Sequence, residues 1–196
     1  IMSITKKELF DYFNSSIAYI YVLIFLITSH IYFFKHLFIF NQASMISFFT
    51  FAPYFFLFLI PAISMRVWSE EKKSGTLAFL FTLPIKEYQL ILGKYIASLI
   101  FLLFIIISTL PFAFVVFYLG NPEILTILTS YIALFMLGAC FLSIGFLMSS
   151  LTKNQIVSFL LTAILSVIFY FLNTPLIIYS LPSFFTPILN YCSLEF

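Results

Sequence analysis

The chain has 196 residues, of which 63% are hydrophobic and 21% aromatic, while Asp, Glu, Lys and Arg together make up only 8%. A soluble domain carries about 25% charged residues and keeps a large surface in water, so it could not hide 29 Phe and 12 Tyr. The net charge of +2 is too small for a polyanion partner. The composition therefore excludes a soluble globule, a disordered chain and a nucleic-acid-binding protein, and it predicts a protein surrounded by the lipid bilayer.

Five apolar stretches predict membrane-spanning helices, because roughly 20 residues of helix cross a bilayer. In chain order they are residues 17–34, 48–65, 96–119, 124–151 and 156–172. All sixteen charged residues, nine basic and seven acidic, lie between these stretches or at the chain ends, as expected when a charge at the bilayer centre is costly. The predicted fold class is an all-α polytopic helix bundle that forms one domain over residues 1–196.

The basic residues predict how the spans are oriented. If the N-terminus lies in the cytoplasm, eight of the nine basic residues stay inside and only Lys35 lies outside. After the fifth stretch, residues 174–196 include Pro182 and Pro187, which break a straight helical span. We therefore expect a cytoplasmic N-terminus and an external hairpin over residues 174–196.

Groups that could carry catalysis are nearly absent from the predicted spans. The sequence holds no H-E-x-x-H motif, no P-loop and no pair of acidic residues within a span, so the chain is not expected to be an enzyme or to hydrolyse a nucleotide. His30 and His36 lie at the outer end of the first span, and an interfacial histidine beside Tyr32 is favoured over a functional one. Cys140 and Cys192 form no C-x-x-C pair, so neither a metal site nor a disulfide is expected.

The longest polar connection covers residues 66–94 and holds eight of the sixteen charges. A charged turn is expected to lead into a short helix with a capping hydroxyl, an apolar face and a proline stop: Ser74 or Thr76, then Leu77, Leu80 and Phe81, then Pro84. Such a helix could lie on the lipid headgroups or fit a socket on a motor subunit. The spacing alone leaves both open.

The residues of this connection resemble a known family. The order Glu-Glu-Lys-x-x-Gly-Thr from Glu70 to Thr76, followed by Pro84 and by Gly93-Lys94, is similar to the first cytoplasmic loop of ABC-2-type transporter permeases, most of all the bacterial gliding-motility-type group. The turn at residues 149–156 and the start of the chain around Lys7-Glu8-Leu9 resemble the same family. The family has six spans, so the resemblance implies that the last span is absent from this chain.

The resemblance implies the permease subunit of an ATP-binding cassette transporter in the bacterial inner membrane, expected to be an exporter. ATP and Mg would bind to a separate cytoplasmic ATPase subunit and no cofactor to this chain, and a second permease, identical or different, would complete the path. The coupling loop that docks on the ATPase would comprise Glu70, Glu71, Lys72, Lys73, Ser74, Gly75, Thr76, Leu77, Leu80, Phe81 and Pro84.

Further site residues are expected in the remaining segments. By resemblance, residues 1–16 form an interfacial elbow helix, with Lys7 facing water and Leu9, Phe10 and Phe13 in the interface, and the second span turns Tyr54 and Phe58 toward a central cavity. In the fourth span, small residues at helical spacing predict close packing between helices: Gly138, Gly145 and Ser149. The alternative function is a membrane anchor or assembly protein that transports nothing, which would need no ATPase.

Overall fold

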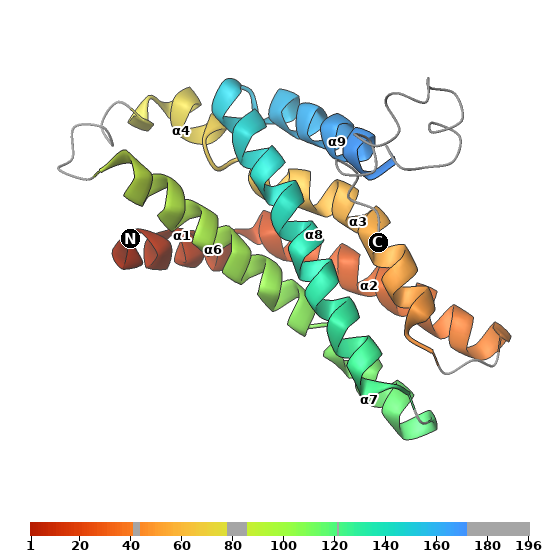
Figure 1. Cartoon of the computed structure of the whole chain (residues 1–196). Helices are drawn as coiled ribbons and strands as arrows, with labels where there is room; N and C mark the ends of the chain where they lie inside the picture. The colour runs from red at the N-terminus through yellow and green to blue at the C-terminus, as the bar shows by residue number, and fades with distance from the viewer. Residues whose placement is uncertain (41–43, 78–85, 121, 172–196) are drawn as a thin grey trace, which may run out of the picture.

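The computed structural model describes residues 1–40, 44–77, 86–120 and 122–171 (Figure 1). Within these ranges the chain is all-helical and contains no strand, which confirms the predicted class. The helices in chain order are α1 Met2–Asn14, α2 Ser16–Phe40, α3 Ile46–Ser64, α4 Ser69–Ser74, α6 Glu87–Ile107, α7 Leu110–Leu119, α8 Ile124–Leu151 and α9 Gln155–Phe171.

Four helical stretches of the described residues are long and apolar enough to cross a membrane: Ala18–Ile39, Ile46–Ser74, Glu87–Leu119 and Ile124–Leu151. Each of them overlaps one of the first four predicted spans, and the first three extend beyond the prediction. The described part of α9 is apolar but has 17 residues, so its role as a fifth span stays a prediction. The hairpin expected over residues 174–196 lies outside the described residues.

The third predicted span, residues 96–119, consists of two helices, and the first of them, α6, starts earlier and ends sooner than predicted. α6 begins at Glu87 instead of residue 96, so the last part of the 66–94 connection is helical. An apolar pattern does not detect these first turns, although an acidic residue such as Glu87 suits a helix N-terminus. The helix is interrupted at Ser108 and Thr109, and α7 starts with Pro111 in its first turn, where a missing N–H costs no hydrogen bond.

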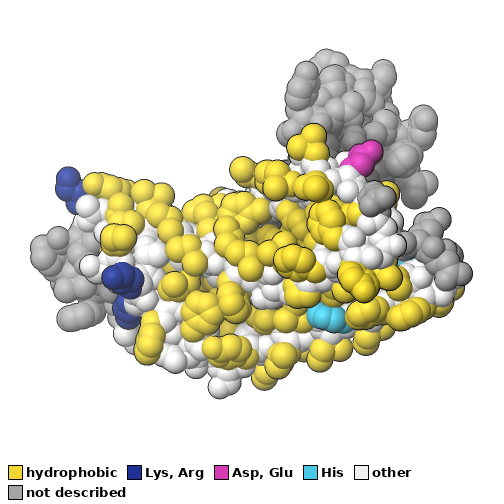
Figure 2. Space-filling view, turned by 90° about the horizontal axis from the view of Figure 1, so that it is seen from below, with side chains coloured by type: hydrophobic (Ala, Val, Ile, Leu, Met, Phe, Trp, Pro, Cys, Tyr) yellow, Lys and Arg dark blue, Asp and Glu magenta, His cyan; other side chains and the backbone are white. Residues whose placement is uncertain are grey.

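The bundle is centred on α3, which packs against α2, α8 and α9, while α6 packs against α1 and α8. Its core is rich in phenylalanine, and the Phe112 ring stacks on Phe33 with centroids 4.9 Å apart. Large apolar side chains also cover much of the outside, for example Leu23, Ile27 and Phe114, and Figure 2 shows apolar side chains over most of the visible face. A surface of this kind is suited to lipid tails, not to water.

The small residues of α8 lie where helices approach closely. A Cβ atom on Gly138 would come within 2.6 Å of Leu102 Cδ2 in α6, and one on Gly145 within 2.1 Å of Ser64 Oγ in α3. Ser149 is fully buried on the same face. Helix α8 can therefore contact both neighbours only because these positions carry almost no side chain.

The N-terminal helix α1 runs parallel to the first half of α6. Thr5 Oγ1 donates to the Gly93 carbonyl at 3.2 Å, and the Tyr12 hydroxyl shares a 2.9 Å hydrogen bond with Ser98 Oγ, so contacts advance together along both helices. The Tyr12 ring stacks on Phe101 at 5.1 Å. Burial raises the pKa of the Tyr12 hydroxyl above its ordinary value.

The predicted elbow residues occupy different environments on α1. Phe13 packs edge-on against the rings of Phe101 and Phe104. Leu9 is half-buried, whereas Lys7 is exposed and Phe10 is 68% exposed. The side of α1 that carries Tyr12 and Phe13 therefore faces α6, and Phe10 is free to contact lipid.

Candidate functional site

Charged residues gather at one end of the bundle. Helix α1, the connection from α3 through α4, the first turns of α6 and the turn between α8 and α9 lie at this end (Figure 1). Among the described residues, the charged side chains outside it are Lys35 in α2 and Glu123 before α8. Figure 2 shows Lys and Arg at one end of the visible face and an acidic side chain toward the other. We call the charged end the polar end.

A buried lysine lies at the centre of the polar end. Lys94, in the second turn of α6, is 2% exposed. Its Nζ donates to Glu8 Oε1 of α1 at 2.9 Å and to Glu71 Oε1 of α4 at 2.7 Å. It also donates to the Val67 carbonyl at 3.3 Å and lies 5.3 Å from the centroid of the Trp68 ring. We call Glu8, Glu71 and Lys94 the Lys94 cluster.

The contacts of the cluster explain how a lysine can be buried in a membrane protein. An ammonium group has three N–H donors, and the two carboxylates and the Val67 carbonyl provide three acceptors. A buried charge without such partners costs several kcal/mol. Two carboxylates share one ammonium, and Glu71 Oε2 is buried with no hydrogen-bond partner among the described residues.

Sequence reasoning missed this cluster, because it uses Lys94 only as a basic residue ahead of the third span and as part of the Gly93-Lys94 resemblance. The position of Lys94 on its helix contains a usable signal. Ser98 and Phe101, four and seven residues later, are buried, so Lys94 lies on the stripe of α6 that faces the bundle. A lysine on such a stripe requires a carboxylate from a neighbouring helix.

A second contact holds the turn between α3 and α4. Ser149 Oγ of α8 accepts hydrogen bonds from the backbone N–H groups of Trp68 and Ser69 at 3.1 and 3.2 Å, and it donates to the Met65 carbonyl at 3.2 Å. The first N–H groups of a helix have no partner within that helix. Ser149 therefore caps α4 from another helix, and nearby Lys72 Nζ donates to the Ser150 carbonyl.

The structure separates the residues expected in the coupling loop. The charged residues from Glu70 to Lys73 form the short helix α4 instead of a turn. Glu70 and Lys73 are exposed, whereas Glu71 and Lys72 are half-buried and bond to the chain's own bundle. Charged residues at this spacing share a helix, and only part of a helix can face outward.

Helix α4 ends just before the expected start of the capped helix, where Thr76 and Leu77 are again helical. Gly75 has a φ of +76°, the left-handed conformation in which glycine commonly ends helices. Ser74 Oγ donates to the Glu70 carbonyl at 2.9 Å and lies 2.9 Å from Thr76 Oγ1, so both hydroxyls point back toward α4. Leu77 packs near Trp68, and the expected positions of Leu80, Phe81 and Pro84 lie outside the described residues.

Both histidines have local contacts at the opposite end of the bundle. His30 Nδ1 lies 2.7 Å from the Leu26 carbonyl, and its ring packs edge-on against Phe112 with centroids 4.5 Å apart. The histidine beside Tyr32 is His36, at 4.9 Å, and not His30. These contacts are those of packed side chains.

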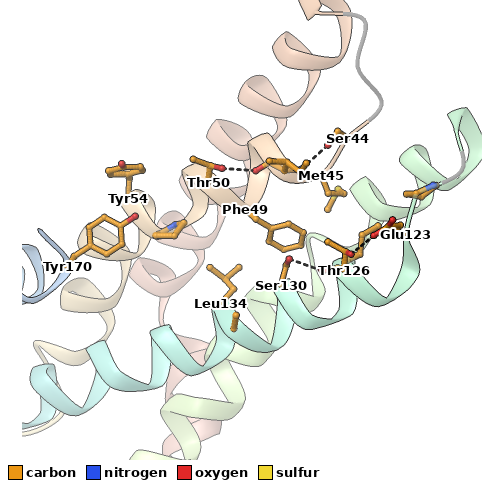
Figure 3. Close-up of a pocket in the computed structure, with 15 residues that line it drawn as sticks. Ser44, Met45, Phe49, Thr50, Tyr54, Glu123, Thr126, Ser130, Leu134 and Tyr170 are labelled. Atoms are coloured by element: carbon orange, nitrogen blue, oxygen red, sulfur yellow. Dashed lines mark hydrogen bonds between the residues drawn. The ribbon is translucent and has the colours of Figure 1, made fainter. Parts of the chain in front are cut away.

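A pocket of about 500 Å³ opens between α3 and α8 near the end opposite the polar end. Figure 3 shows Tyr54 and Tyr170 on one side of it and the Thr126–Glu123 hydrogen bond, 2.9 Å long, on the other. Tyr54 therefore lines a pocket. Phe58, one turn further along α3, is 68% exposed and is not among the lining residues.

Comparison with known proteins gives one family. The model of the ABC-2 family transporter protein matches residues 2–189, which is nearly the whole chain. Neither the curated proteins nor the solved structures give a match. With four helices able to span a membrane and a match of this length, the chain belongs to the ABC-2 transporter family and is a multi-pass membrane permease subunit of an ABC transporter.

Proposed function

We propose that this permease works in an exporter that is driven by a separate cytoplasmic ATPase, and that the ATPase binds at the polar end. The observation that carries the proposal is the distribution of charge. Of the nine basic residues, eight lie at the polar end and only Lys35 lies elsewhere, and basic residues mark the cytoplasmic side of a membrane protein. The polar end, with the N-terminus, then faces the cytoplasm.

The need for a partner follows from what the chain lacks. Its sequence contains no nucleotide-binding motif, so ATP and Mg would bind to the partner. A partner can shift this chain between two states only through contacts that differ in those states. Glu70 and Lys73 on the exposed side of α4 are available for such contacts.

The pocket lined by Tyr54 is the proposed part of the substrate path in this subunit. It combines apolar walls with hydroxyl groups and one carboxylate, that of Glu123, among the described residues. Phe58 is exposed on the helix at the centre of the bundle, and we assign it to contact with a second permease subunit. The likeness to gliding-motility permeases stays a prediction.

The test uses two single-cysteine variants, Lys73→Cys at the polar end and Lys35→Cys as the matched control, with Cys140 and Cys192 replaced by Ala. Both lysines are exposed. An impermeant maleimide should label Lys35→Cys in intact cells and Lys73→Cys only in opened membranes. A bifunctional crosslinker should join Lys73→Cys, and not Lys35→Cys, to the ATPase.

Two results would contradict the proposal in different ways. Labelling of Lys73→Cys in intact cells would show that the polar end faces the outside of the cell, opposite to the proposed orientation. Correct orientation without any crosslink to an ATPase would favour the membrane anchor or assembly protein, because that alternative has the same spans but no motor.

A further inference from the structure

We propose that Lys94 is a positioning residue that clamps α1 and α4 to α6, so that a displacement of α4 by the ATPase reaches α1 and α6 together. This inference rests on the proposed function, because it needs a partner that moves α4. It assigns a role to a buried group that neither the docking contacts nor the substrate path uses.

The first support is that the cluster joins three segments that are far apart in the sequence. Glu8 and Lys94 are separated by 86 residues, and Glu71 and Lys94 by 23. Between them they connect the N-terminal helix, the base of the proposed docking segment and a membrane-long helix. One ammonium group is thus the shared contact of α1, α4 and α6.

The second support is that α4 depends on contacts from outside itself. A helix of six residues is far too short to be stable alone, so its position is set by its partners. Ser149 and the Ser150 carbonyl hold it to α8. Toward α6, the described polar contacts of residues 65–77 both involve Lys94, which binds Glu71 and the Val67 carbonyl.

The third support is that the two ties can be changed independently. Glu8 carries the tie to α1 and Glu71 the tie to α4, while Lys94 serves both. The second oxygen of Glu71 is buried without a hydrogen-bond partner among the described residues, so Lys94 is the only described partner of the Glu71 carboxylate. The contact between Lys94 and α4 can therefore change without breaking the contact between Lys94 and α1.

The experiment follows motion in the complex of the full chain with its ATPase, reconstituted in lipid vesicles. The reporter is Phe10→Cys, on the exposed side of α1, in a chain whose Cys140 and Cys192 are replaced by Ala. The measurement is its rate of labelling by a thiol reagent with and without ATP and Mg. The variants are Glu8→Gln, Glu71→Gln and the triple Glu8→Gln/Glu71→Gln/Lys94→Met. Copurification of the ATPase is measured for each.

The matched control is Lys86→Met. Lys86 also lies over an aromatic ring at the polar end, 6.0 Å from the centroid of Tyr88, but it is exposed. It should keep both the bound ATPase and the response of the reporter to ATP. A local signal comes from Trp68, the only tryptophan of the chain, whose emission in the isolated permease should shift in Glu71→Gln and stay unchanged in Lys86→Met.

The expected result is that all variants bind the ATPase, while the ATP-dependent change in labelling falls by about tenfold in Glu71→Gln and in the triple variant. Glu8→Gln should reduce the change as well, since it removes the ion pair between Lys94 and α1, while Thr5 and Tyr12 still hold α1 against α6. The inference is overturned if Glu71→Gln keeps the full change, or if the unmodified cluster shows no change with ATP. If the triple variant does not insert, Glu71→Gln, whose side chain has the same size, decides. Failure of the unmodified chain to bind an ATPase would instead refute the proposed function.

Discussion

Replacing Lys94 by Met is the most demanding test of the cluster's energetics. The variant keeps an unbranched side chain but leaves the carboxylates of Glu8 and Glu71 close together without their shared cation. Breaking a buried ion pair by removing one partner costs about 3–5 kcal/mol. Both glutamate side chains are 16% exposed, so water screens them in part and the lower value, about 3 kcal/mol, applies.

The assay is thermal unfolding of the purified chain in detergent. For a chain of this size, a loss of 3 kcal/mol corresponds to a fall in Tm of about 6–12 °C. The triple variant Glu8→Gln/Glu71→Gln/Lys94→Met should recover most of that loss, because replacing a whole buried charge group is often nearly neutral. The reasoning would be refuted if Lys94→Met had the same Tm as the unmodified chain. It would also be refuted if the triple variant had a Tm as low as that of Lys94→Met.

Three further substitutions test the close contacts. Ser149→Ala should destabilise the chain by about 2 kcal/mol and expose α4 to proteolysis, because it leaves two buried N–H groups without an acceptor. Ser150→Ala is its control, since that hydroxyl bonds only within its own helix, and equal effects of the two would contradict the capping role. Gly145→Ala should lower the free energy of unfolding by about 1–3 kcal/mol, because its Cβ would overlap Ser64, and unchanged melting would refute that contact. Gly75→Ala should cost only about 1 kcal/mol from backbone strain and give a smaller fall in Tm, since the new Cβ would meet no atom within 4 Å among the described residues beyond its chain neighbours.

The membrane helices could be read from the sequence because each is a long apolar run bounded by charges or prolines. The first turns of α6 could not, since Glu87 and Lys94 place a charge at each end of a short segment, which is typical of a connection although the segment is helical. The helical form of α4 was not predicted for a similar reason. Its four consecutive charges suggest a turn, and its helical form depends on capping by Ser149 from another part of the chain.

The contacts of the site were harder to predict than the helices. The residues that bind Lys94 lie 23 and 86 residues earlier, and only the packing of α1 and α4 against α6 brings them together. The four charges of α4 look equivalent in the sequence. The structure distinguishes them, because Glu71 and Lys72 face the bundle while Glu70 and Lys73 face outward. No pattern of charge or spacing along one segment contains that difference.

The pairing of α1 with α6 also determines when the contacts of α1 can form during synthesis. Both carboxylates that bind Lys94 precede it in the chain, so they have left the ribosome before the lysine emerges. The ammonium group therefore meets its acceptors as soon as α6 enters the bilayer. The reverse holds for α1, whose Tyr12 and Phe13 must wait at the membrane surface or on the insertion machinery until α6 has been made.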